Sequence, residues 1–341
     1  MNSEPSSASH IDQVCLGRTG MSVSRIGFGG LFVASFAAEY DEAKQAVRHA
    51  LDMGITYFDT APTYGNSEEV LGKALAGVAE PVVLSTKLGG RPTSFDPQNK
   101  ECLRASIEQS LKDLGRDSVD ILMVHEPDRP GQYRWWTDMV NVEGPVLELL
   151  DELKAEGKIR FSGIGGTTTS EMAHLCRSGK FDVVLTAFHY SLLFREAALE
   201  VIPAAKEAGM GVIVGSPLQQ GALAARYDEQ IESPAAFWIS GPRREQFRAL
   251  YQLLDECGIS LPELGIRFVL SNPDIHCVLM GARSADQVSQ NVQAASAGPL
   301  PGNLLKRLDE IAAMVPFRPF GEPAGLGWFL GNPGGYQGQG A

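Results

Sequence analysis

Eight apolar runs, separated by segments with helical periodicity, constrain the fold of this chain more than any other feature. The runs are residues 23–30, 55–61, 82–88, 119–125, 159–165, 183–190, 211–218 and 277–283. Most are continuously apolar rather than alternating, which is typical of parallel strands buried on both faces. The segments between them, such as 103–114 and 146–153, place their apolar side chains on one stripe of a helix. This alternation predicts right-handed crossovers and a parallel sheet.

Polar residues at three predicted strand ends favour a closed barrel over an open sheet. Asp59, Lys87 and His125 lie at or near the ends of the second, third and fourth runs, and barrel enzymes build their sites at the carboxyl ends of their strands. An open sheet that binds a dinucleotide should carry G-x-G-x-x-G, but Phe32 and Thr168 occupy the last glycine position of GFGGLF and GIGGTT. We therefore predict an α/β fold, a single (β/α)8 TIM barrel with long loops on its C-terminal face.

The predicted barrel occupies residues 14–315. Residues 1–13 are expected to form a flexible tail, and 316–341 a loop or tail rich in glycine and proline. Two insertions, 126–143 and 227–242, follow predicted strands on the same face. Because long loops above a barrel commonly shape substrate pockets, we expect Trp135 and Trp136 of the first insertion to contact the substrate; Phe237 and Trp238 of the second are equally consistent with packing within a surface loop.

Glycine and capping residues predict several helix ends. Asn66 and Glu69 have the spacing of a capping box at a helix start. Helix ends are predicted at Gly54, Gly115, Gly157 and Gly209.

The charge balance and the cysteines limit the partners and the compartment. Against 29 Lys and Arg stand 41 Asp and Glu, a formal net charge of −12, which argues against nucleic acid because its phosphates demand a basic face. The five cysteines include no C-x-x-C pair, so neither a disulfide framework nor a thiolate zinc site is indicated. No secretory leader pattern and no run of about 20 apolar residues is present. We expect a cytoplasmic protein without membrane partners, and its oligomeric state stays open.

Asp59, Tyr64, Lys87 and His125 form a candidate catalytic tetrad because their side chains complement one another chemically. A phenol with a pKa of about 10 exchanges protons poorly at neutral pH unless a cation stabilises its phenolate. Lys87 can supply that cation, and Asp59 can keep Lys87 charged when both are buried. His125 can donate a hydrogen bond to a substrate oxygen. The tetrad thus predicts proton transfer by Tyr64, coupled to hydride transfer at a carbonyl or alcohol carbon.

A metal-dependent barrel hydrolase is the alternative from another enzyme class. It would use Asp59, His125 and Glu126. Such sites need several ligands that converge from different strand ends, and among the six histidines of the chain too few lie at such ends. We therefore expect no metal site.

The motifs around the tetrad resemble those of the aldo-keto reductase superfamily, over roughly residues 14–315. GITYFDTAPTYGNSEEVLGKAL (54–75) resembles the signature segment with the aspartate and the tyrosine; STKLG (85–89) carries the lysine and DILMVHEPD (120–128) the histidine. GSPLQQGAL (215–223) and GARSADQVSQN (281–291) are similar to the two nucleotide-binding segments of the family. The resemblance implies a (β/α)8 barrel that binds NAD(P)(H) without a Rossmann domain and transfers hydride to or from a small-molecule carbonyl compound.

The resemblance also implies residue roles. Tyr64 is the general acid or base, Lys87 and Asp59 tune it, and Tyr64 and His125 contact the substrate. The cofactor residues that it implies are Gly29, Gly30, Leu31, Asp59, Gly165, Gly166, Ser216, Pro217, Leu218, Gln220, Gly221, Gly281, Ala282, Arg283, Gln287 and Asn291.

This chain departs from the pattern of the family around the nicotinamide and the ribose. Many members have Ser-Asn at 165–166, a glutamine near 187 and an aromatic residue at 215, where this chain has glycine or alanine. Tyr190 or the glycine-rich loops are therefore expected to hold the nicotinamide. NADPH-preferring members often carry lysine and arginine where Gly281 and Gln287 stand, although Arg283 could still bind a 2′-phosphate. The cofactor is thus NAD or NADP, with NAD slightly favoured.

The overall pattern is most similar to the branch with galactose, fucose and related aldose dehydrogenases and pyridoxal dehydrogenase. With NAD, oxidation is the favoured direction, on an aldose or a related small hydroxy or aldehyde compound. Two alternatives stay open: an NADPH-dependent carbonyl reductase of broad specificity, and a non-catalytic NAD(P)H-binding regulatory subunit, as some barrel relatives are subunits of ion channels.

Overall fold

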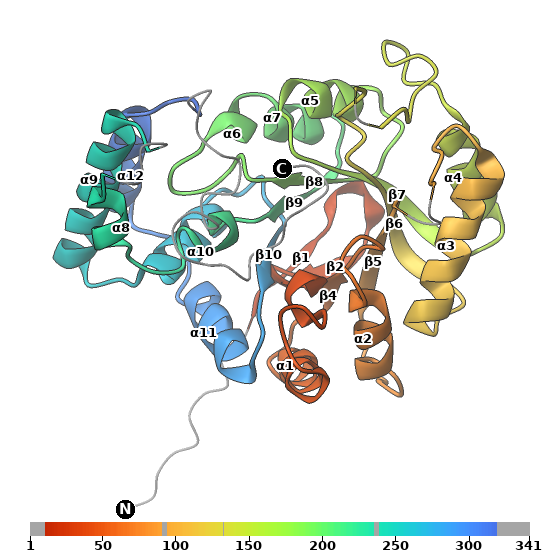
Figure 1. Ribbon diagram of the computed structural model, residues 1–341, viewed down its shortest axis with the longest axis horizontal. Helices are drawn as coiled ribbons and strands as arrows, with labels where there is room; N and C mark the ends of the chain where they lie inside the picture. The colour runs from red at the N-terminus through yellow and green to blue at the C-terminus, as the bar shows by residue number, and fades with distance from the viewer. Residues whose placement is uncertain (1–10, 91–93, 132, 235–238, 319–341) are drawn as a thin grey trace, which may run out of the picture.

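The computed structural model of the chain describes residues 11–90, 94–131, 133–234 and 239–318. In these residues, eight parallel strands close into a barrel in the order β10–β3–β4–β5–β6–β7–β8–β9, at the centre of Figure 1. The strands are β3 Ile26–Gly29, β4 Tyr57–Asp59, β5 Val83–Leu88, β6 Val119–His125, β7 Ile159–Gly166, β8 Val183–Ala187, β9 Gly211–Gly215 and β10 Cys277–Gly281. Seven of the eight predicted runs contain one of them, the run 159–165 ends one residue before β7 does, and the predicted barrel is confirmed.

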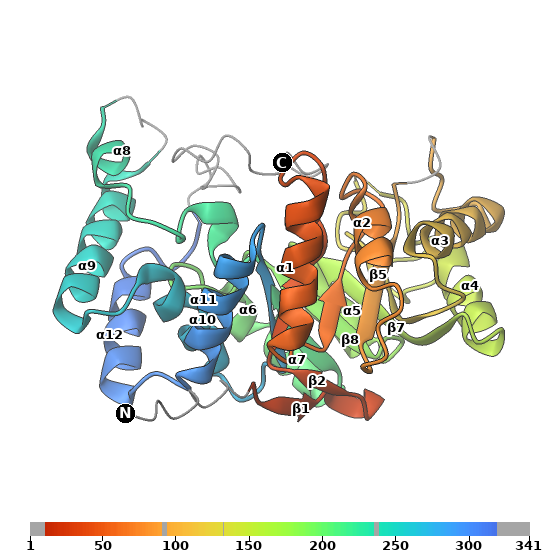
Figure 2. The ribbon, with the colours of Figure 1, turned by 90° about the horizontal axis from the view of Figure 1, so that it is seen from below.

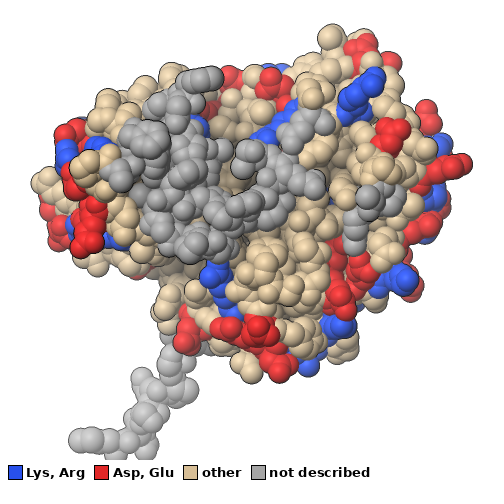
Figure 3. All heavy atoms as spheres, in the orientation of Figure 1, with Lys and Arg blue, Asp and Glu red and all other residues tan. Residues whose placement is uncertain are grey.

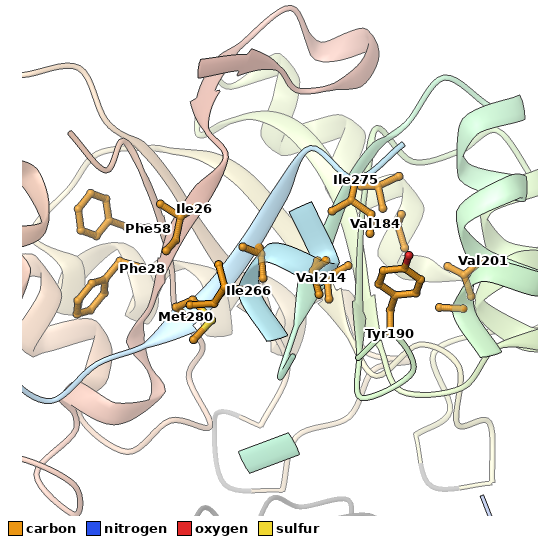
Figure 4. Packing of buried hydrophobic residues seen from close by; sticks show 14 of the residues in the cluster. Ile26, Phe28, Phe58, Val184, Tyr190, Val201, Val214, Ile266, Ile275 and Met280 are labelled. Carbon is orange, nitrogen blue, oxygen red and sulfur yellow. The ribbon is translucent and has the colours of Figure 1, made fainter. Parts of the chain in front are cut away.

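Helices surround the barrel (Figure 1). They are α1 Tyr40–Asp52, α2 Ser67–Ala74, α3 Lys100–Leu114, α4 Pro145–Ala155, α5 Ser170–Arg177, α6 Glu196–Leu199, α7 Val201–Glu207, α8 Asp228–Glu232, α9 Gly241–Cys257, α10 Leu261–Leu270, α11 Ala285–Ser296 and α12 Gly302–Ala313. One large apolar cluster fills the layer between strands and helices, part of which Figure 4 shows, and a second cluster fills the barrel interior. The strands are therefore buried on both faces, which explains their continuous apolar character.

An antiparallel hairpin covers the amino-terminal end of the barrel (Figure 2). It consists of β1 Gln13–Cys15 and β2 Ser22–Ser24, so the predicted strand 23–30 is two strands, and regular structure begins before the expected boundary at residue 14. The turn approaches β9 so closely that a Cβ at Gly17 would lie 2.3 Å from the backbone nitrogen of Gly211. Leu16 and Met21 of the hairpin belong to the interior cluster and seal this end of the barrel.

The predicted glycine signals are confirmed, but the capping box is wrong. The predicted helix-end glycines have left-handed backbone, with φ of 88° at Gly54, 61° at Gly115, 71° at Gly157 and 65° at Gly209. Helix α2 begins after Asn66, but the Asn66 side chain makes no capping bond and instead accepts a hydrogen bond of 2.8 Å from the Ser35 amide. Asn66 thus ties α2 to the segment that follows β3.

The insertion at 126–143 leaves the C-terminal face of the barrel after its first half. Trp135 lies near the strand ends, whereas Lys180, which precedes β8, donates to the carbonyls of Asn141 and Val142. The end of the insertion therefore passes down the outside of the barrel. In the second insertion α8 and the start of α9 are helical, and Phe237 and Trp238 lie outside the described residues.

Acidic and basic side chains are mixed along α3 and α4, at the right of Figure 3. Lys100 Nζ lies 2.7 Å from Glu152 Oε1, and Arg104 reaches the other oxygen of the same carboxylate at 2.8 Å. Such exposed pairs contribute little stability individually.

Membrane-spanning helices, clusters of metal ligands and disulfides were sought in the described part of the chain. No helix there is long and apolar enough to cross a bilayer. No group of three or more histidine, cysteine, aspartate or glutamate side chains there could hold a metal ion. All five cysteines are free thiols.

Candidate active site

Three adjacent strands bring the four tetrad side chains together. Asp59 ends β4, Lys87 lies near the end of β5, and His125 ends β6, while Tyr64 lies in the turn before α2. Lys87 Nζ lies 2.6 Å from Asp59 Oδ2 and 4.7 Å from the centroid of the Tyr64 ring. The rings of Tyr64 and His125 meet edge to face with their centroids 5.9 Å apart. The residues predicted as a tetrad therefore form one cluster.

Lys87 is a buried ammonium between two oxygen acceptors. Its side chain is 2% exposed, and Nζ donates to Asp59 Oδ2 and, at 2.7 Å, to the carbonyl of Thr60. Burial lowers the pKa of Lys87, but Asp59 and Tyr64 outweigh it and raise the pKa above its usual value. Lys87 is therefore charged at neutral pH and can stabilise a phenolate at Tyr64.

His125 is a neutral imidazole. Burial, with smaller contributions from the charges of Lys87 and Arg129, lowers its pKa to about 3. Its Nδ1 lies 3.5 Å from the hydroxyl of Thr63, and a hydroxyl that donates to Nδ1 leaves the ring proton on Nε2. His125 can then donate a hydrogen bond without carrying charge.

Ser85 is a polar residue of the site that was not among the residues predicted from the sequence. Its hydroxyl donates to Asp59 Oδ1 at 2.6 Å, opposite the oxygen that binds Lys87. Because side chains two positions apart on a strand share a face, the spacing of Ser85 and Lys87 could have revealed it.

Apart from Asp59 on β4 and Gly165 and Gly166 on β7, the predicted cofactor residues lie on three neighbouring segments of the barrel rim, next to the tetrad. They follow β9, β10 and β3, which are adjacent in the barrel, and β4 with Asp59 comes next. Gly29 ends β3; Gly30 and Leu31 begin a 3₁₀ turn, Gly30–Val33; Ser216, Pro217 and Leu218 follow β9; Gln220 and Gly221 lie in the turn Gln219–Gly221; Gly281 ends β10; Ala282 and Arg283 precede α11; Gln287 and Asn291 lie in α11.

The backbone of these segments fits an anionic dinucleotide. After β9, Ser216, Gln220 and Gly221 have left-handed backbone, with φ of 51°, 53° and 108°, a tight turn of the kind that presents amides to phosphate. Ser284 caps the 12-residue helix α11, which follows β10, and helix amino termini favour anions.

The predicted cofactor residues Gly165 and Gly166 lie in two different environments. A Cβ at Gly165 would lie 3.7 Å from Lys87 Cε, inside the barrel, whereas Gly166 faces Met172 and Asp128.

Residues 25–313 match the Aldo/keto reductase family. The chain belongs to this family. It is therefore an NAD(P)-dependent oxidoreductase, as the resemblance of its motifs implied.

Relatives of this aldo/keto reductase include sugar dehydrogenases. It is 32% identical to L-galactose dehydrogenase of Arabidopsis thaliana over 93% of this chain and 98% of that protein. It is 29% identical to D-threo-aldose 1-dehydrogenase of a Pseudomonas species over 87% of this chain and 96% of that protein. Among solved structures, an aldo-keto reductase from Bacillus halodurans in its holo form matches with a TM-score of 0.75 and 27% identity, covering 92% of this chain and all of that chain.

Two expectations about aromatic residues of this aldo/keto reductase are wrong. Tyr190 is 7% exposed, stacks on Phe268 of α10 and bonds through its hydroxyl to Asn272; Figure 4 places it among Val184, Val201 and Val214, in the layer outside the barrel. It therefore cannot hold the nicotinamide.

The second wrong expectation concerns Trp136. Its indole donates to the carbonyl of Pro127 and its ring packs against Phe181, so Trp136 does not fit the substrate role predicted for it. Trp135 is also buried, but it lies beside His125 and donates to the His125 carbonyl at 3.0 Å.

The low pKa of His125 predicts an acid-sensitive fold. Below pH 6.5 the histidine of the unfolded chain gains a proton, whereas folded His125 stays neutral down to about pH 3. Stability should therefore fall as the pH drops through this window. At pH 5 the loss relative to pH 7.5 should be about 2 kcal/mol larger for the wild type than for His125→Asn. Urea unfolding of both proteins at both pH values measures it, and equal losses in the two proteins would contradict it.

Proposed function

We propose that this aldo/keto reductase oxidises an aldose, or a related small hydroxy compound, with NAD as its preferred cofactor. The observation that carries the proposed chemistry is the buried ammonium of Lys87, fixed by Asp59 beside Tyr64. A charged lysine at this distance stabilises a phenolate, and a phenolate can remove the proton of a substrate hydroxyl. In the direction of reduction the same phenol returns the proton.

The proposed division of labour follows from the charge of each group. Neutral His125 donates a hydrogen bond to the reacting oxygen and orients the carbon. Tyr64 exchanges the proton of that oxygen, and Lys87 with Asp59 holds the charge that develops on the phenol. When bound, the nicotinamide supplies the hydride acceptor in oxidation and the hydride donor in reduction. The segments after β9, β10 and β3 would hold the dinucleotide.

A sugar substrate is supported by the relatives and by one carboxylate. Two of the relatives named above are dehydrogenases of L-galactose and of D-threo-aldoses. Glu126 directly follows His125 in a left-handed conformation, with φ of 52°, and is only partly buried. Carboxylate oxygens accept hydrogen bonds from hydroxyl groups, so Glu126 is suited to bind a second hydroxyl of the substrate. Trp135 supports this end of β6 through its hydrogen bond to the His125 carbonyl.

The NAD preference is supported by the charges around the start of α11. The guanidinium of Arg283 lies over the Phe32 ring, 5.2 Å from the ring centroid. The backbone amide of Arg283 donates to Gln287 Oε1 at 2.8 Å. Asp286 adds an acidic side chain to the first turn. A 2′-phosphate would meet one cation and one nearby anion, which weakens its binding.

Absorbance at 340 nm during reactions with a panel of aldoses, with NAD and NADP in parallel, tests the proposal. We expect NADH formation with at least one aldose, and a kcat/KM for NAD above that for NADP. Exclusive NADPH-driven reduction of aldehydes would overturn the proposal in favour of a broad carbonyl reductase. Binding of cofactor without turnover of any substrate would favour a regulatory subunit.

A further inference from the structure

A chain of buried hydrogen bonds runs from the barrel interior to the tetrad. The hydroxyl of Tyr57 donates to Ser85 Oγ at 2.8 Å, and Ser85 Oγ donates to Asp59 Oδ1 at 2.6 Å. Asp59 Oδ2 then accepts from Lys87 at 2.6 Å. Tyr57, Ser85, Asp59 and Lys87 are each at most 2% exposed.

The Ser85 hydroxyl has one proton to donate, and its neighbours determine which acceptor receives it. Burial, and then the negative charge of Asp59, raise the pKa of Tyr57 well above its ordinary value, so its hydroxyl keeps its proton. Tyr57 donates its hydroxyl proton in the hydrogen bond to Ser85 Oγ, which leaves the single proton of the Ser85 hydroxyl for another acceptor. The other acceptor near Ser85, the carbonyl of Phe58, lies farther away at 3.4 Å. The Ser85 proton therefore points at Asp59.

The Asp59 carboxylate needs this donor because it is buried. A carboxylate oxygen without a hydrogen bond in a dry interior is costly and free to rotate away from its partner. Ser85 holds Oδ1 while Lys87 binds Oδ2, and the carbonyl of Thr60 holds the ammonium on its other side. The position of the ammonium beside Tyr64 is thus set by the orientation of Asp59.

Tyr57 connects this arrangement to the packed interior of the barrel. It belongs to the interior cluster with Leu16 and Met21 of the hairpin. Gly27 leaves room for the ring, because a Cβ there would lie 2.9 Å from Tyr57 Cδ1. Tyr57 therefore lies beneath the tetrad as a fixed support.

We propose that Ser85, supported by Tyr57, is a positioning residue that orients the Asp59 carboxylate and thereby holds Lys87 beside the Tyr64 phenol. The inference rests on the proposed function, since it assigns Ser85 and Tyr57 to the proton transfer at Tyr64. Without the Ser85 hydroxyl, the lysine stabilises the phenolate less, and Tyr64 loses its proton at a higher pH.

The pH dependence of the Ser85→Ala variant tests this role. The pH at which kcat for aldose oxidation is half-maximal should rise by about one unit, so kcat falls about tenfold at pH values well below the wild-type midpoint and recovers at alkaline pH. A second readout needs no substrate: phenolate absorbance is titrated in each protein, and the same titration of its Tyr64→Phe counterpart is subtracted, because the chain has eight tyrosines. The transition should move by the same amount. Ser85→Thr restores the hydroxyl and should return both readouts to wild type.

Thr86→Val is the matched control. It also removes a buried hydroxyl from β5, but this hydroxyl donates to Glu68 at 2.5 Å, away from Asp59. Thr86→Val should lower stability and leave the pH profile unchanged. If Ser85 had a purely structural role, Ser85→Ala would behave in the same way. Tyr57→Phe, which keeps the ring, should shift the profile in the same direction by a smaller amount; it carries the test if Ser85→Ala does not fold.

The outcomes separate the two proposals. If no aldose is oxidised but the phenolate transition moves in Ser85→Ala, the proposed function is wrong and the positioning role stands. If aldoses are oxidised and both readouts stay within 0.3 pH unit of wild type, the positioning role is overturned and the proposed function stands.

Discussion

Replacement of Tyr64 by phenylalanine is expected to lower kcat by about 10³-fold, because a positioned general acid or base contributes about 10² to 10⁴-fold. The substitution removes one oxygen atom and keeps the ring that faces His125. Binding of NADH should change little, because the predicted dinucleotide contacts lie on the segments after β9, β10 and β3. Initial rates at 340 nm and a fluorescence titration with NADH measure the two quantities.

Tyr40→Phe is a suitable control for this prediction. Tyr40 begins α1 on the outside of the barrel and is 40% exposed, so loss of its hydroxyl should leave kcat unchanged. A Tyr64→Phe variant that retains more than a tenth of the wild-type kcat would show that another group carries the proton.

The barrel and the clustering of the tetrad could be predicted because both follow from local pattern. Continuous apolar runs mark strands buried on two faces, and parallel strands bring their carboxyl ends to one rim, so Asp59, Lys87 and His125 had to lie near one another. The chemical roles of the tetrad residues stay predictions.

The side-chain contacts that the sequence did not predict involve partners far away in the chain. Tyr190 is held by Asn272, 82 positions later, and no local pattern indicates such a contact. Asn66 has the residue type of a helix cap, but the same amide serves equally well to bind the backbone at Ser35. Trp136 follows a strand end as a pocket residue would, yet its insertion turns down the outside of the barrel toward Lys180. In each case the residue type was compatible with two environments, and the tertiary fold selected one.

Lys87→Met should destabilise the protein by about 3–5 kcal/mol, because it leaves the Asp59 carboxylate buried without a counter-ion. The variant should also lose its turnover, since nothing else supplies a charge beside the Tyr64 ring at 4.7 Å in the part of the site that the structure describes. The double variant Lys87→Met with Asp59→Asn removes both charges, so it should be more stable than the sum of the single effects predicts. Urea unfolding without cofactor gives the free energies of the four proteins in this cycle.

Lys73→Met provides the comparison that separates burial from ion-pair geometry. Lys73 Nζ lies 2.6 Å from Glu69, the same distance as Lys87 from Asp59, but its side chain is 57% exposed rather than 2%. Water screens the exposed pair and solvates Glu69 once the lysine is gone, so Lys73→Met should change stability far less than Lys87→Met. Equal losses in the two variants would mean that the Asp59 carboxylate finds water or another donor when Lys87 is removed. The tetrad would then not depend on a buried ion pair, and Asp59 would not be the group that keeps Lys87 charged beside Tyr64.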